Sequence, residues 1–169
     1  MLESLNTNPI IIHQYNIGGD QNAGFAIYDA IKASKCKFLF ICYGSASSMG
    51  SIVPQAVIGK GLRVTHPHTE WLIHEGSCET SGTTKQFISN AEALKRSKEL
   101  MYDIYVNACK KGAKFKGKKP VEIKAILKRR LNVKEDWILD GHQAVDYGFA
   151  DIVFGKGQNT SIDNIIKRL

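Results

Sequence analysis

The residues with the clearest potential for chemistry lie in one short segment, residues 44–50, which read Gly-Ser-Ala-Ser-Ser-Met-Gly. An apolar run over residues 38–43 is typical of a buried strand, and residues 51–57 can start a helix. A turn of small residues between a strand and a helix can expose a serine hydroxyl, and the N–H groups at the start of the helix favour an oxyanion beside it. Ser48 is therefore a candidate nucleophile. Three neighbouring serines compete with it and are otherwise turn or cap residues: Ser45, Ser47 and Ser51.

A serine hydroxyl needs a base to remove its proton, and that base is most often a histidine oriented by a carboxylate. His74 is the preferred base, because it follows the apolar residues 71–73 where a strand meets a loop. His66 and His68 lie in a turn and could pair on a metal, but no third ligand has fitting spacing. The other two histidines lie in a strand and at a helix start: His13 and His142. Four carboxylates could orient the base, and spacing alone does not separate them: Asp136, Asp140, Asp146 and Asp151.

The composition of the 169 residues is that of an ordinary globular protein, with 43% hydrophobic and 23% charged residues. We expect one domain over residues 1–169, with its core in residues 1–154 and a tail over residues 155–169. The chain has no apolar run of membrane-spanning length and no signal-peptide pattern, which predicts a cytoplasmic protein with no membrane partner. Its cysteines form no CxxC pair, so we expect free thiols and no metal site. They are Cys36, Cys42, Cys78 and Cys109.

The net charge of +7 comes from one part of the chain. Residues 95–134 hold 14 lysines and arginines against 3 acidic residues, and the densest run lies at residues 110–119. A solvated, mobile insertion is the favoured interpretation, ahead of a patch for nucleic acid or an acidic partner. The run carries no aromatic residue except Phe115 and no RNA-binding signature, so nucleic acid is not an expected partner.

Strand-like and helix-like segments alternate along the chain, which predicts an α/β layered fold with parallel strand pairs. The expected strands cover residues 9–15, 37–43, 62–65, 71–74 and 152–154. The expected helices cover residues 23–33, 48–59, 83–111, 120–131 and 141–147, with a weak helix over 161–169. Pro54 requires a local adjustment within the second of these helices.

Four segments together resemble the Clp protease proteolytic-subunit family. Residues 44–50 resemble its active-serine segment, residues 18–29 its Gly-Gly segment and the following helix, and residues 72–75 its histidine strand. Residues 136–139, followed by 144–151, resemble its aspartate and closing helix. Each segment alone is a weak signal. All four occur in the family's order and cover residues 1–154.

The resemblance implies a role for five residues of this chain. Ser48 matches the nucleophile, His74 the base and Asp136 the orienting carboxylate. Gly19 and Met49 match the two backbone N–H donors of the oxyanion hole. Glycine at position 19 would allow the backbone to approach a substrate closely.

The resemblance also implies a fold and an assembly. The family shares the crotonase-like fold of repeated β-β-α units, and a long helix with an adjoining strand forms the handle between two stacked seven-membered rings. Here residues 76–85 would be the handle strand and residues 83–111 the handle helix. The implied activity is serine endopeptidase cleavage of unfolded polypeptides in the ring chamber, with no metal or other cofactor in the peptidase. An ATP-driven AAA+ unfoldase would supply the substrate.

Three features depart from the family pattern. The chain is expected to begin near the last turn of the family's first helix, without the axial-loop segment, which puts unfoldase docking in question. The stretch from His74 to Asp136 is long, because of the basic run, and residues 20–22 are unusually polar.

Other functions remain open from sequence. They are a catalytically silent structural or regulatory ring subunit, a phage capsid-maturation protease of the same fold, and an acyl-CoA enzyme of the crotonase fold. A peptidase with a Ser–Lys dyad is another, and its candidate lysines are Lys85, Lys95 and Lys98.

Overall fold

The computed structural model describes residues 8–77, 79–159 and 161–169. Within them the strands are β1 (Ile10–Asn16), β2 (Phe38–Ser47), β3 (Gly61–Thr65), β4 (Glu70–Ile73), β5 (Trp137–Leu139) and β6 (Ile152–Val153). The α-helices are α1 (Gln21–Ala33), α2 (Met49–Ile52), α3 (Thr84–Cys109), α4 (Pro120–Lys134), α5 (Gly141–Tyr147) and α6 (Ile162–Ile166). Two 3₁₀ helices complete the elements: η2 (Val53–Val57) and η3 (Ala113–Phe115). The expected mixed α/β fold is confirmed.

The sheet is organised around β2, the strand that leads to the candidate nucleophile. β1 pairs with β2 in parallel along one edge. The other edge is shared, because β3 pairs with residues 38–42 and β4 with residues 45–47, both in parallel. β5, which is not among the strands expected from the sequence, pairs with β4 in the antiparallel direction, unlike the parallel pairs expected and found around β2. A crossover of two helices separates β4 from β5, which leaves room for the strand to return in either direction.

The side chains of β2 are buried on both faces of the sheet. Phe38, Phe40 and Cys42 join the larger core cluster, which includes apolar residues of the helices α1 to α5. Leu39 and Ile41 join a smaller cluster with Ile165 of α6. This arrangement explains why β2 reads as a continuous apolar run, since a strand covered on both faces has no polar alternation.

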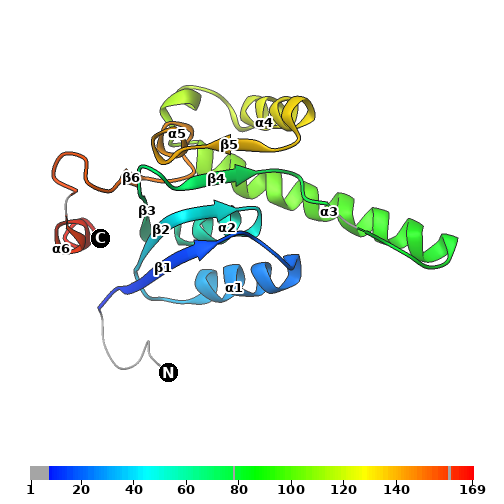
Figure 1. Cartoon of the computed structure of the whole chain (residues 1–169), viewed down its shortest axis with the longest axis horizontal. Helices are drawn as coiled ribbons and strands as arrows, with labels where there is room; N and C mark the ends of the chain where they lie inside the picture. Colours follow the sequence, from blue (N-terminus) through cyan, green and yellow to red (C-terminus); the bar gives the residue numbers. More distant parts are fainter. Residues whose placement is uncertain (1–7, 78, 160) are drawn as a thin grey trace.

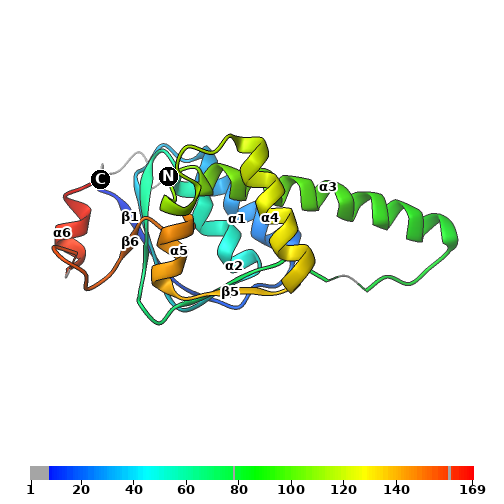
Figure 2. The same cartoon turned by 90° about the horizontal axis from the view of Figure 1, so that it is seen from above.

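The C-terminal part of the long helix α3 packs into the core, and its N-terminal part projects from the fold. Its first turn is closed by a capping box between Thr83 and Gln86. Residues 101–109 supply its buried side chains, whereas residues 84–100 are exposed or only partly buried. Figures 1 and 2 show this N-terminal part of α3 extending well beyond the rest of the fold. No helix among the described residues is long and apolar enough to cross a membrane.

Two expected elements differ from the structure, and a third is confirmed. The helix over residues 48–59 is instead the single turn α2 followed by η2, because Pro54 interrupts the α-helical hydrogen bonds near its position. The handle strand over residues 76–85 is wrong, since none of its described residues lies in a strand and α3 begins at Thr84. The expected weak helix over residues 161–169 is confirmed as α6, whose apolar residues pack onto the sheet.

The basic run at residues 110–119 is an ordered connection between α3 and α4 rather than a mobile insertion. Phe115 in η3 is only 2% exposed and packs near the ring of Tyr147. Gly112 lies so close to the Tyr147 carbonyl that a Cβ there would approach its oxygen to 2.5 Å. The lysines of this run are exposed, while the backbone beneath them is fixed.

Candidate active site

Ser48 lies at the sharp turn where β2 ends and α2 begins. Its backbone has φ 53° and ψ −124°, a conformation that a residue with a side chain rarely adopts. Its N–H donates to the carbonyl of Leu72 in β4 at 2.9 Å, which fixes the turn against the neighbouring strand. Strain of this kind costs about 1–3 kcal/mol and is concentrated at functional sites.

The strand pairing brings the three expected triad residues together. Ser47 is paired with Leu72 across β2 and β4, so Ser48 and His74 leave their strands at the same end. Ile73 is paired with Trp137 across β4 and β5, so Asp136 lies just before β5 beside His74. The register of three strands therefore carries residues distant in sequence to one place.

The three side chains form a hydrogen-bonded succession. His74 Nε2 lies 2.8 Å from Ser48 Oγ, and His74 Nδ1 lies 3.1 Å from Asp136 Oδ1. If Nδ1 carries the proton, it donates to the carboxylate, and Nε2 accepts from the serine hydroxyl. The side chain of His74 is 24% exposed and that of Asp136 is 55% exposed, so the succession opens to solvent at the aspartate.

The residues expected to form an oxyanion hole lie beside Ser48. Gly19 and Met49 line the same cavity as the serine. Met49 is the first residue of α2, so its N–H has no acceptor within the helix. Gly19 has φ +137°, and a Cβ there would meet no atom within 4 Å, so its backbone is open to the cavity.

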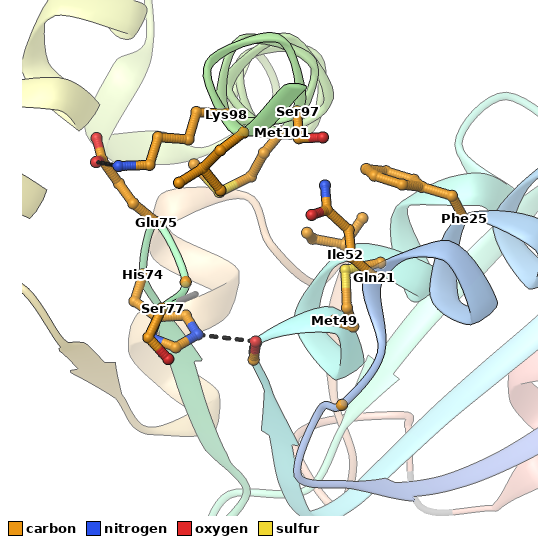
Figure 3. Close-up of a pocket in the computed structure, with 14 residues that line it drawn as sticks. Gln21, Phe25, Met49, Ile52, His74, Glu75, Ser77, Ser97, Lys98 and Met101 are labelled. Carbon is orange, nitrogen blue, oxygen red and sulfur yellow. Dashed lines mark hydrogen bonds and ion pairs between the residues drawn. The ribbon is translucent and has the colours of Figure 1, made fainter. Parts of the chain in front are cut away.

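A cavity of about 280 Å³ lies between Ser48 and α3. Figure 3 shows the His74 ring on one side of this cavity, Met49 and Ile52 below α3, and Phe25 on the other side. Its apolar lining residues are Phe25, Met49, Ile52, Leu94 and Met101. Small-molecule pockets usually measure about 300–1,000 Å³, so this cavity lies just below the lower end of that range.

The competing serines are engaged elsewhere. Ser45 and Ser47 hydrogen-bond each other, with their hydroxyl oxygens 2.7 Å apart. Ser51 donates to the carbonyl of Ser48 at 2.6 Å and also contacts the hydroxyl of Tyr105 at 2.7 Å. Ser48 is thus the serine that faces the imidazole.

The competing carboxylates also have other positions. Asp140 accepts from the N–H of Gln143 and caps α5. Asp151 forms an ion pair with the buried guanidinium of Arg63 at 2.6 Å. Asp146 is exposed on α5.

The competing histidines and lysines lie away from the serine or have other partners. The His66 ring stacks between Tyr43 and Phe154, and burial lowers its pKa. His13 contacts the Tyr43 hydroxyl at 2.7 Å. Lys98 lines the cavity, but its Nζ is paired with Glu75 at 2.7 Å. Lys85 and Lys95 lie on the exposed part of α3. Of the cysteines expected to be free, Cys36, Cys42 and Cys109 are so, and Cys78 lies outside the described residues.

Sequence reasoning missed two features of the site. The first is Gly18, because a Cβ at this position would lie 2.6 Å from the Cβ of Ser48. The Gly-Gly pair was the available signal, but the close approach was assigned to Gly19 alone. The second is the pairing of Glu75 with Lys98, for which spacing gave no signal, since the two residues are 23 positions apart.

A mixed α/β fold with serine, histidine and aspartate in hydrogen-bond succession beside a cavity is typical of hydrolases that use an activated nucleophile. Comparison with known proteins identifies the class more narrowly. The family model described as Clp protease matches residues 1–157, and the chain therefore belongs to the Clp protease family.

Two relatives illustrate the similarity. The ATP-dependent Clp protease proteolytic subunit 2 of Prochlorococcus marinus subsp. pastoris is 30% identical over 158 residues, which cover 92% of this chain and 71% of that protein. The ATP-dependent Clp protease proteolytic subunit of Deinococcus radiodurans is 36% identical over 88 residues, which cover 52% of this chain and 43% of that protein. The expected family is confirmed.

Proposed function

We propose that this chain is a serine endopeptidase that hydrolyses peptide bonds of unfolded polypeptides. The observation that carries the proposal is the succession Ser48 Oγ, His74 and Asp136, with separations of 2.8 Å and 3.1 Å. Both separations fall within or near the range expected for a nucleophile, its base and an orienting group, about 2.6–3.2 Å.

The proposed reaction uses each residue in a defined role. His74 removes the proton of Ser48 as Oγ attacks the scissile carbonyl, and then gives that proton to the leaving amine. Asp136 orients the imidazole and stabilises its charged form. The N–H groups of Gly19 and Met49 donate to the oxygen of the tetrahedral intermediate. Water then releases the acyl group by the same steps.

We expect Ser48→Ala to abolish this activity, because it removes the attacking oxygen and leaves the fold intact. Two measurements check the prediction: hydrolysis of a fluorogenic peptide and covalent labelling by a fluorophosphonate. Loss of a triad nucleophile costs about 10⁶-fold in kcat.

Ser45→Ala is the matched control, because Ser45 lies in the same segment and does not face His74. It should label like the wild type. Hydrolysis by Ser48→Ala at the wild-type rate would overturn the assignment. An assembled wild-type protein that never labels would favour the silent ring subunit.

The family also suggests how the peptidase is assembled. We propose that the whole chain folds as one domain and forms a homo-oligomeric ring, with seven subunits and two stacked rings as the expected form. The projecting part of α3 supports this, because it carries exposed Phe87 and Ile88 that a partner subunit could cover. We further propose a cytoplasmic location and an AAA+ unfoldase as the source of substrate. The described free cysteines fit a reducing compartment.

A further inference from the structure

The described part of the segment that follows the candidate base has no regular structure of its own. β4 ends at Ile73, and none of the described residues from His74 to Thr83 lies in a helix or strand. The hydrogen bonds of the His74 ring go to Ser48 and Asp136, which are themselves the groups that it must align. The position of His74 therefore depends on what holds the chain on either side of it.

Glu75, the residue directly after His74, is hydrogen-bonded to α3 and so fixes the chain at this point. Its carboxylate accepts from Lys98 Nζ at 2.7 Å and from the Tyr102 hydroxyl at 2.5 Å. Lys98 and Tyr102 are four residues apart on α3, so both point from the same face of that helix. Figure 3 shows the Lys98 side chain reaching from α3 to Glu75, above His74.

Both hydrogen bonds fit the charge states of their groups. The hydrogen bonds from Lys98 and Tyr102 lower the pKa of Glu75, so it is a carboxylate at neutral pH. Burial, and then the hydrogen bond to Glu75, raise the pKa of Tyr102, which keeps its hydroxyl a donor. Tyr102 is only 2% exposed, so its hydroxyl is held in place by packing.

The same turns of α3 also hold α4, the helix that leads to Asp136. Lys124 pairs with Glu99 at 2.9 Å and with Asp103 at 2.7 Å. Lys128 pairs with Glu99 at 2.5 Å, and its Nζ lies 5.1 Å from the centre of the Tyr102 ring. α4 ends two residues before Asp136. Residues 98–103 of α3 are thus a common support for the segments that carry the base and its orienting carboxylate.

We propose that Glu75 is a positioning residue, which aligns His74 with Ser48 and Asp136 by fastening the segment after β4 to Lys98 and Tyr102 of α3. The proposal rests on the peptidase function above and adds to it a residue that acts through His74. In this arrangement α3 fixes the positions of both the His74 imidazole and the Asp136 carboxylate.

Glu75→Leu tests this, because leucine is of similar size but accepts neither hydrogen bond. We expect kcat for a fluorogenic peptide to fall on the order of 10–100-fold, with KM within about threefold, since misplacement of a catalytic group by 1 Å can cost about 100-fold. The rate of fluorophosphonate labelling at Ser48 should fall in parallel. Glu75→Gln keeps an acceptor for Tyr102 and should recover part of the loss.

Two milder variants keep the test valid if Glu75→Leu folds poorly. Tyr102→Phe removes one donor and Lys98→Met removes the other, and each should lower kcat by a smaller factor. Tyr102→Phe should add almost nothing in the Glu75→Leu background, because the bond that it would break is already absent. With a purely structural role for Tyr102, the losses of kcat caused by Tyr102→Phe and by Glu75→Leu would instead add.

Glu79→Leu is the matched control, because Glu79 is an exposed carboxylate in the same segment with no ion pair to a described residue. It should leave kcat unchanged. Wild-type labelling rates in folded, assembled Glu75→Leu would overturn the proposal, as would losses that follow the melting temperature and that glutamine does not recover. Failure of the peptidase function is distinguishable, because the wild type would then not label at all.

Discussion

At the scale of single residues, the site depends on a tight contact between two backbone turns. Ser48 adopts φ 53° at the end of β2, and Gly18 passes directly against it. Asn16 holds this second turn by accepting from the Gly18 N–H at 2.8 Å. The absence of a side chain at Gly18 is therefore what allows the Gly-Gly segment to approach the serine.

Gly18→Ala should impair the site more than it impairs the fold. The new Cβ would lie 2.6 Å from the Ser48 Cβ, and φ is +99°. We expect the fluorophosphonate labelling rate to fall at least about tenfold, with a stability loss of about 1–3 kcal/mol. Gly59→Ala is the control, because its φ is +91° but its Cβ would meet nothing within 4 Å. Equal labelling by the two variants would contradict this explanation.

The buried pair of Arg63 and Asp151 predicts a pH dependence of stability. Arg63 is 1% exposed and donates to both oxygens of Asp151. Burial raises the pKa of Asp151, but the hydrogen bonds and charge of Arg63 outweigh it and hold the pKa below its ordinary value. The unfolded state therefore binds a proton first as pH falls, so this stabilisation is complete above about pH 4 and is lost below it.

Asp151→Asn tests that dependence. At pH 7 it should lower the free energy of unfolding by about 3 kcal/mol, because a buried guanidinium loses its counter-charge. Urea unfolding at a series of pH values from 7 to 3 would give the free energy of unfolding of the wild type and of Asp151→Asn. The difference between them should shrink as pH falls through the pKa of Asp151. A constant difference would rule out the pair as its source.

At the scale of elements, strand register and helix supports position the site. β4 and β5 are short, but their pairing places His74 and Asp136 side by side. Polar side chains of α3 then hold the segments that carry these two residues. Lys98 pairs with Glu75, the residue after His74, and Glu99 pairs with Lys128 of α4. An element of this kind has a role beyond its apolar face, which explains why a central part of α3 carries acidic and basic residues toward its neighbours.

Phe115 should anchor the connection between α3 and α4. Phe115→Ala removes a buried ring that packs beside Tyr147, and we expect a loss of about 3–5 kcal/mol in the free energy of unfolding. Urea denaturation would measure it. Val133→Ala, at a residue that is 78% exposed, should change stability by less than about 0.5 kcal/mol. Similar losses for the two variants would show that the basic run is not anchored by Phe115.

At the scale of the whole molecule, the projecting half of α3 carries exposed apolar side chains that are available for contact with another subunit. Phe87 is 57% exposed and Ile88 is 53% exposed near its tip, far from the core that receives the buried side chains of residues 101–109. Apolar side chains in that position are typical of a surface that a partner covers.

The double variant Phe87→Asp/Ile88→Asp should reduce assembly, because it places charge where we propose that subunits meet. Analytical ultracentrifugation should show a smaller species than the wild type, and circular dichroism should show an unchanged helix content. Val133→Asp is the control, since Val133 is exposed on α4 rather than on the projection. An unchanged sedimentation coefficient in the double variant would exclude this surface from the assembly.

Local patterns and motifs in the amino-acid sequence were enough to predict the class of fold, the family and the candidate residues. Apolar runs and helical periodicity are local properties, so the main strands and helices could be predicted closely, as could the small-residue turn at Ser48. His74 was already preferred from its place at a strand end, and four motifs in the family's order selected Asp136, which spacing alone could not. The strand β5 and the irregular segment after His74 were missed, because each depends on neighbouring elements. At Pro54 only a local adjustment was expected, whereas the helix changes there to η2.

Contacts between groups that are distant in the sequence follow from strand pairing and helix packing. The alignment of Ser48, His74 and Asp136 follows from the register of β2, β4 and β5, and no local pattern encodes a register between distant segments. The fastening of Glu75 to Lys98 and Tyr102 likewise exists only once α3 packs against the end of β4. The side chains of the site could thus be identified from the sequence, but long-range packing is what brings them into contact.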